Sequence, residues 1–84
     1  MKNLGSMVRW IVLFRCRNKR EGYHQSIVYR DGRFAMFTTR SKARAFARRE
    51  LGYISRRADL RREPHGWLVP LVVRATITAR RMTP

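Results

Sequence analysis

Apolar and polar residues alternate along residues 8–16. Val8, Trp10, Val12, Phe14 and Cys16 occupy one set of positions, and Arg9, Ile11, Leu13 and Arg15 occupy the other. A period of two with β-branched and aromatic residues is typical of a β-strand. Because the second set is half apolar, we expect this strand to lie inside a sheet and to be partly covered on both faces.

Two apolar-rich runs follow, residues 23–30 and 33–38, separated only by Asp31 and Gly32. An Asp-Gly pair in this position is typical of a hairpin with a type I′ turn. This turn pairs Arg30 with Arg33, Tyr29 with Phe34, Val28 with Ala35, and Ile27 with Met36 across the two strands. We expect the face with Ile27, Tyr29, Phe34 and Met36 to join the core. The other face, with Val28, Arg30, Arg33, Ala35 and Phe37, is a candidate contact surface.

The spacing of apolar residues becomes helical over residues 40–51. Ala43, Phe46, Ala47 and Leu51 fall on one stripe, which Ile54 extends, and Lys42, Arg44, Arg48 and Arg49 fall on the other side. The hydroxyl of Thr39 is suited to cap the first turn, and Gly52 is expected to end the helix in the left-handed conformation. Glu50, near the helix end, is expected to pair with a neighbouring Arg.

The rest of the chain contains a charged segment and a second alternating run. Residues 55–66 fit either a short helix, capped by Ser55 and ended by Pro64, or an exposed loop. In residues 67–78 we expect Trp67, Val69, Leu71, Val73, Ala75 and Ile77 to point inward, and Leu68, Pro70, Val72, Arg74 and Thr76 to point outward. Because Pro70 has no N–H to donate, this strand should lie at an edge or carry a bulge there.

The order strand, hairpin, helix, strand predicts a small α+β domain spanning residues 1–84. It would consist of an antiparallel sheet of about four strands with one helix packed on a face. The expected core collects Trp10, Phe14, Tyr29, Phe34, Phe46 and Trp67. We expect residues 1–6 and 79–84 to be flexible, and Met7 is an alternative start to Met1.

Charge is the most unusual property of the composition. The 84 residues include 20 Lys and Arg but only 5 Asp and Glu, which gives a formal net charge of +15. A hydrophobic content of 44% argues against a disordered basic tail. The apolar runs are too short for a membrane span, the N-terminus does not resemble a secretory signal, and Cys16 has no partner for an internal disulfide. We therefore expect a cytoplasmic protein, in the host cytoplasm if it is phage-encoded.

The residue types that carry catalysis or bind metals lack the required spacing. Cys16, His24 and His65 do not match a zinc-binding pattern. Asp59, Glu63 and His65 are close in sequence, but ion pairs with the surrounding arginines explain the acids better than an acid–base cluster does. No glycine-rich loop is placed to hold a phosphate. We therefore expect no enzymatic activity, no catalytic residue, no metal, no cofactor and no small-molecule substrate.

The cations predict an anionic partner. Arg40, Lys42 and Arg44 lie in the first turns of the helix, where the dipole disfavours each by about 0.3–1 kcal/mol. Two arginine doublets, Arg56–Arg57 and Arg61–Arg62, suit bidentate contacts to phosphates. The candidate binding residues are Arg30, Arg33, Phe37, Arg40, Lys42, Arg44, Arg48, Arg49, Arg56, Arg57, Arg61 and Arg62.

Two functions fit this pattern. The first is salt-dependent, non-enzymatic nucleic-acid binding with little sequence specificity, in which RNA or single strands are slightly favoured because no element is built to read a major groove. Phe37 and Tyr53 are then the candidates to stack on bases.

The alternative is a small modulator or inhibitor, of the type made by phages and mobile elements, that binds an acidic host protein or a nucleoprotein complex. Residues 37–51 resemble strand-to-helix junctions in small proteins of phages and mobile elements, a resemblance that names no family. Phe37, Val28 or Leu68 would then add apolar affinity to electrostatic steering. No membrane partner is expected, and the oligomeric state stays open.

Overall fold

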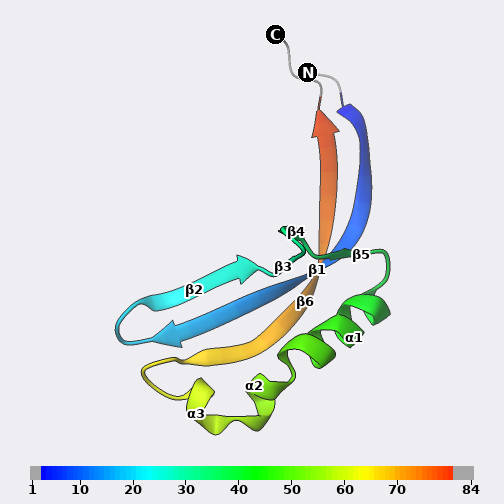
Figure 1. The fold of residues 1–84 in the computed structure, drawn as a ribbon. Helices are drawn as coiled ribbons and strands as arrows, with labels where there is room; N and C mark the ends of the chain where they lie inside the picture. The colour runs from blue at the N-terminus through cyan, green and yellow to red at the C-terminus, as the bar shows by residue number, and fades with distance from the viewer. Residues whose placement is uncertain (1–2, 81–84) are drawn as a thin grey trace.

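The computed structural model describes residues 3–80, which form one four-stranded antiparallel sheet, a separate hairpin and three helices (Figure 1). The elements in chain order are β1 (Asn3–Asn18), β2 (Gly22–Ile27), β3 (Tyr29–Arg30), β4 (Arg33–Phe34), β5 (Met36–Phe37), α1 (Arg40–Leu51), α2 (Tyr53–Arg56), α3 (Ala58–Arg61) and β6 (Trp67–Arg80). The predicted α+β class, with an antiparallel sheet of about four strands, is confirmed.

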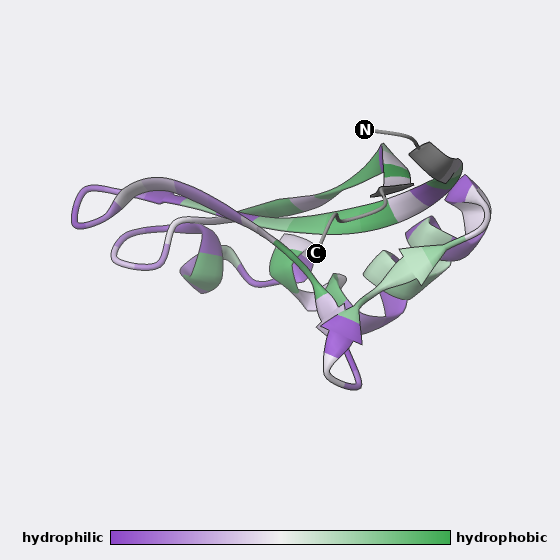
Figure 2. Ribbon diagram, turned by 90° about the horizontal axis from the view of Figure 1, so that it is seen from above, coloured by the Kyte–Doolittle hydropathy of each residue, from purple (hydrophilic) through white to green (hydrophobic). Residues whose placement is uncertain are grey.

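Strand β1 is the centre of the sheet. β6 pairs with it along one edge, from Asn3–Arg80 to Cys16–Trp67, while β2 and β5 share the other edge. Figure 1 shows β1 and β6 as one long, bent ribbon, and Figure 2 shows hydrophobic residues along its middle and hydrophilic loops at its end. The pairing includes residues 3–6 and 79–80, which the sequence suggested were flexible. The remaining residues of those two segments lie outside the described part of the chain.

Helix α1 covers one face of the sheet and has the predicted bounds, because its signals are local. The Thr39 hydroxyl accepts a hydrogen bond from the Lys42 backbone N–H at 3.2 Å, so the predicted cap is confirmed. The apolar stripe of α1 packs against β1, β5 and β6. Together these elements form the core, which contains Val12, Ala35, Phe37, Ala43 and Phe46.

The hairpin has the predicted turn but buries the opposite face. Asp31 and Gly32 both have positive φ, as a type I′ turn requires, and Tyr29 pairs with Phe34. Yet Tyr29 is 59% exposed and Phe34 46%, while Phe37 is only 8% exposed. The predicted inward face, with Ile27, Tyr29, Phe34 and Met36, is therefore wrong, as is the placement of Tyr29 and Phe34 in the core.

The physical reason lies in the strand pairing. The predicted Ile27–Met36 pair does not form, because Ile27 pairs with Leu13 and Met36 pairs with Ile11, both on β1. Neighbouring residues on β1 alternate between faces, and Val12, between these two, is buried under α1. Ile27 and Met36 therefore lie on the face that turns away from the helix, and Phe37 packs against Phe46 with a ring-centroid distance of 5.0 Å.

Pro70 predicted an edge strand or a bulge, and β6 has both features. The register shifts between Leu13 and Arg15, so that Val69 and Pro70 both lie opposite Phe14. The extra residue reverses the alternation within β6. Trp67 contacts Phe14 and Val72 packs on the core, so both lie on the helix side, although the sequence placed them on opposite faces.

Within residues 3–80, no helix lies over the face of the sheet that turns away from α1. We call it the open face, and it carries Ile11, Leu13, Met36, Leu71 and Val73, which are cross-strand partners in the register. Met36 is 45% exposed and Leu71 42%. The predicted inward positions Leu71 and Val73 thus lie on the open face, away from the helix.

The connection after α1 resolves the choice left open for residues 55–66, since it contains two short helices, α2 and α3, followed by a turn. Gly52 has φ −64°, a right-handed conformation, so the left-handed helix end expected there is wrong. A Cβ at this position would collide with the carbonyl oxygen of Arg48, which explains the glycine. Ser55 lies inside α2 and donates to the carbonyl of Gly52 at 2.9 Å, so it is not a cap.

Candidate nucleic-acid interface

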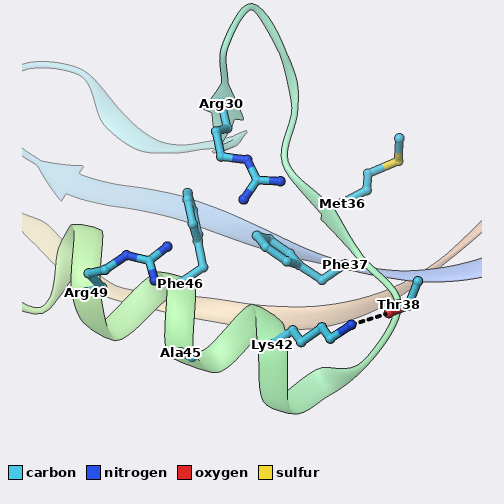
Figure 3. A pocket seen from close by; sticks show the side chains of 8 residues that line it. All are labelled: Arg30, Met36, Phe37, Thr38, Lys42, Ala45, Phe46 and Arg49. Carbon is cyan, nitrogen blue, oxygen red and sulfur yellow. Dashed lines mark hydrogen bonds between the residues drawn. The ribbon is translucent and has the colours of Figure 1, made fainter.

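An open cleft of about 470 Å³ lies between the hairpin and the exposed side of α1 (Figure 3). It is lined by Arg30, Met36, Phe37, Thr38, Lys42, Ala45, Phe46 and Arg49. The chain therefore brings Arg30 from the hairpin together with Lys42 and Arg49 from the helix. We call this the cationic cleft. Three of the predicted binding cations border it.

Two of the three cations of the cleft, Arg30 and Arg49, lie over aromatic rings. The Arg30 guanidinium lies 5.2 Å from the ring centre of Phe37 and 5.7 Å from that of Phe46, and Figure 3 shows it between the two rings. The Arg49 guanidinium lies 6.0 Å from the same Phe46 ring. Cation–π contacts of this kind restrict a guanidinium without using its N–H donors. The donors of Arg30 are therefore available to an anion.

A second row of cations lies on the other side of Ala45. Arg40, Arg44 and Arg48 follow one another at i, i+4 spacing and line a shallow groove with Ser41. The Arg40 guanidinium lies 5.7 Å from the ring centre of Trp10. The exposed side of α1 therefore presents cations on both sides of a small residue.

Little negative charge opposes these cations. The first turn of α1 contains no acidic residue. Glu50 pairs with Arg49 at 3.2 Å, as predicted, but both side chains are more than half exposed, so water weakens the pair. Among the residues that the structure describes, no acidic side chain lines either the cationic cleft or the Arg40–Arg48 groove. The local field is therefore strongly positive.

The arginine doublets lie elsewhere, on α2 and α3 and the residues after them. Arg57 is engaged in an ion pair with Asp59 at 2.7 Å, and Arg62 donates to the carbonyl of Ala58 at 3.3 Å. The hydrogen bond from Arg57 lowers the pKa of Asp59 below its ordinary value, and the same bond raises the pKa of Arg57. The doublets do not line the cationic cleft, and Arg33 lies at the hairpin turn.

The acids and histidines do not converge on a site. The predicted ion pair of Asp59 with an Arg is confirmed, but Glu63 is wrongly assigned to one. Its carboxylate accepts a hydrogen bond from the Lys19 backbone N–H at 2.9 Å. The His65 ring lies 6.0 Å from the Trp67 ring. Within residues 3–80, no group of three metal-ligating side chains is found.

The aromatic residues available to a ligand differ from those predicted. Phe37 is buried beneath Arg30, and half-buried Tyr53 lies with its ring 6.5 Å from that of Trp67. Both were proposed to stack on bases, and Phe37 is wrong for that role because its ring is in the core. The exposed rings are instead Tyr23, Tyr29 and Phe34. Tyr29 and Phe34 lie at a charged turn, flanked by Arg30 and Arg33, and this is the signal that sequence reasoning missed.

In the described part of the chain, none of the helices has the length and apolar character needed to cross a membrane. In comparisons with protein family models, curated proteins and solved structures, nothing matches this chain.

Proposed function

We propose that this protein binds nucleic acid without catalysis, through phosphate contacts from α1 and the hairpin. The observation that carries the proposal is the cationic cleft, where Arg30, Lys42 and Arg49 converge without an acidic residue in the lining. Guanidinium groups that lie over rings suit phosphate oxygens, because the ring contact uses none of their N–H donors and restricts their position. The neighbouring row of Arg40, Arg44 and Arg48 extends the contact along a chain of phosphates.

A polyanion fits this surface better than a small anion does. The cationic cleft is open, and the cations continue onto a second groove and to the hairpin turn. A net charge of +15 also favours rapid, long-range attraction of a polymer that carries many negative charges. The recognition is expected to depend little on base sequence, since phosphate contacts carry no sequence information.

Salt dependence tests the proposal. A labelled oligonucleotide is titrated with the protein, by fluorescence anisotropy, from about 50 to about 300 mM salt. If about five cations each neutralise one phosphate, log K falls against log salt with a slope of about −3.5 for a single strand. Absence of binding at the lowest salt, or binding that is unchanged across the series, would contradict the proposal.

A second candidate function is modulation of an acidic protein or a nucleoprotein complex. The observation that favours it is the open face, where Met36 and Leu71 remain exposed without a covering layer. Phe37, Val28 and Leu68, the apolar contacts suggested by the sequence, are buried or half-buried and do not supply this surface. A stoichiometric protein partner that is retained after nuclease treatment of a lysate would favour this function over the first.

A further inference from the structure

The hairpin holds two aromatic rings out in solvent. Tyr29 on β3 and Phe34 on β4 are register partners, with ring centroids 4.6 Å apart and an interplanar angle of 52°. Since large apolar side chains are normally buried, an exposed pair on a tight turn calls for an explanation. The type I′ turn fixes the backbone on both sides, so the rings are presented by a defined scaffold and not by a loose loop.

Arg30 connects this ring pair to the cationic cleft. The side chain of Arg30 borders the cleft and also the hollows on both sides of the hairpin. The hollow of about 460 Å³ on the Phe34 side is lined by Arg30, Asp31, Arg33, Phe34 and Met36. A chain of phosphates that leaves the cleft past Arg30 therefore meets Arg33 and the ring of Phe34.

The two sides of the ring pair differ in charge. The Phe34 side has two arginines and one acid, Asp31. The Tyr29 side has one arginine, Arg30, and two acids, Asp31 and Glu50. Phosphates are attracted to the first side and opposed on the second. The charge distribution thus assigns the polymer backbone to the Phe34 side and leaves the rings accessible to flat, uncharged groups.

We propose that Tyr29 and Phe34 form a base-stacking platform, and that the ligand of this protein is single-stranded nucleic acid. The inference rests on the proposed function. It adds a contact to the bases of the ligand, which phosphate contacts do not recognise. Unpaired bases stack on aromatic side chains whatever their sequence, whereas the bases of a duplex are already stacked inside it. DNA and RNA single strands share this chemistry.

The test compares three probes of equal length: a thymidine single strand, an abasic strand with the same phosphates, and a duplex. The protein is expected to bind the thymidine strand at least about tenfold more tightly than the abasic strand. Replacing both rings, Tyr29→Ala with Phe34→Ala, should remove that advantage and leave the affinity for the abasic strand unchanged. A uridine strand reports any preference between RNA and DNA.

Tyr23→Ala is the matched control, because Tyr23 is an exposed tyrosine on β2 with the Arg17 guanidinium over its ring. This variant should bind the thymidine strand as the unaltered protein does. The comparison of probes needs no substitution, so it stands even if the double variant folds poorly.

Equal affinity of the unaltered protein for the thymidine and abasic strands would overturn the platform, and so would a preference for duplex. The platform would also be overturned if the ring variant bound the thymidine strand normally but no longer retained a protein partner from a nuclease-treated lysate. Failure of the unaltered protein to bind any of the probes would instead refute the proposed function itself, so the two failures are distinguishable.

Discussion

The side-chain amide of Asn18 donates a hydrogen bond of 3.1 Å to the backbone carbonyl of His65. The same amide accepts a bond of 2.7 Å from the Glu21 N–H, and Asn18 is only 8% exposed. The N–H of Arg17 donates to the carbonyl of Gly66 at 2.8 Å nearby. The turn between β1 and β2 is thereby joined to the loop before β6.

Asn18→Ala is expected to destabilise the fold by about 1–3 kcal/mol, because the Glu21 N–H and the His65 carbonyl, both part-buried, lose their partners. Thermal and urea unfolding measure the effect. Lys19→Ala is the control: Lys19 is exposed, and its bond to Glu63 uses the backbone N–H, so this variant should unfold like the unaltered protein. Equal stability of both variants would show that the amide does not hold the two loops together.

Gly66→Ala should also destabilise, and more than Gly32→Ala. Both glycines have positive φ, which costs an alanine about 1 kcal/mol or more. A Cβ at Gly66 would in addition collide with the carbonyl oxygen of Arg17, whereas a Cβ at Gly32 meets nothing within 4 Å. The difference between the two unfolding free energies isolates the steric contribution, and a value near zero would contradict it.

Two sets of four Arg→Gln substitutions remove equal charge from different surfaces. One set changes Arg40, Arg44, Arg48 and Arg49 on α1, and the other changes Arg56, Arg57, Arg61 and Arg62. The first should weaken oligonucleotide binding more and reduce the salt slope by about 2–3. Both should leave the melting temperature nearly unchanged, since these side chains are exposed. A larger loss of affinity from the second set would move the interface to α2 and α3.

The Asp59 carboxyl provides a pH test. Its pKa is lowered mainly by the hydrogen bond from Arg57. The pair therefore stabilises the fold above the ordinary carboxyl pKa, and the stabilisation is lost as the pH falls through the lowered value. Arg57→Gln should raise the pKa of Asp59 toward its ordinary value in an NMR titration. An unshifted titration curve would show that the ion pair does not form in solution.

The elements that sequence reasoning predicted well depend on local signals. Helix α1 is specified by the Thr39 cap and by a stripe of apolar residues within a single segment, and the hairpin turn by two adjacent residues. The hairpin faces were wrong for a non-local reason. The register of the hairpin places Tyr29 and Phe34 on the same face. Whether α1 covers that face depends on the pairing of Ile27 and Met36 with β1.

The residues of the candidate site also divide into those that local signals predicted and those whose position depends on non-local contacts. The cations of α1 were predicted from helical spacing, since neighbours on a helix surface can be read from the chain. The position of the Arg30 guanidinium could not be predicted in this way, because it lies over Phe37 and Phe46, which belong to different elements. In β6, the alternation predicted the strand, and Pro70 predicted an edge position or a bulge, but the reversal of faces follows from the register with β1, which the alternation does not contain.

The pairing of β1 with β6 also constrains how the domain is made. The central strand β1 is synthesised before β6, so one of its two edges stays unpaired until β6 leaves the ribosome. Every β1–β6 contact spans most of the described chain, from Cys16–Trp67 to Asn3–Arg80. Such high contact order is associated with folding in milliseconds to seconds, because the chain must close long loops before the contacts form. The cationic nascent chain therefore has to remain soluble, with one edge of β1 unpaired, until β6 has been synthesised.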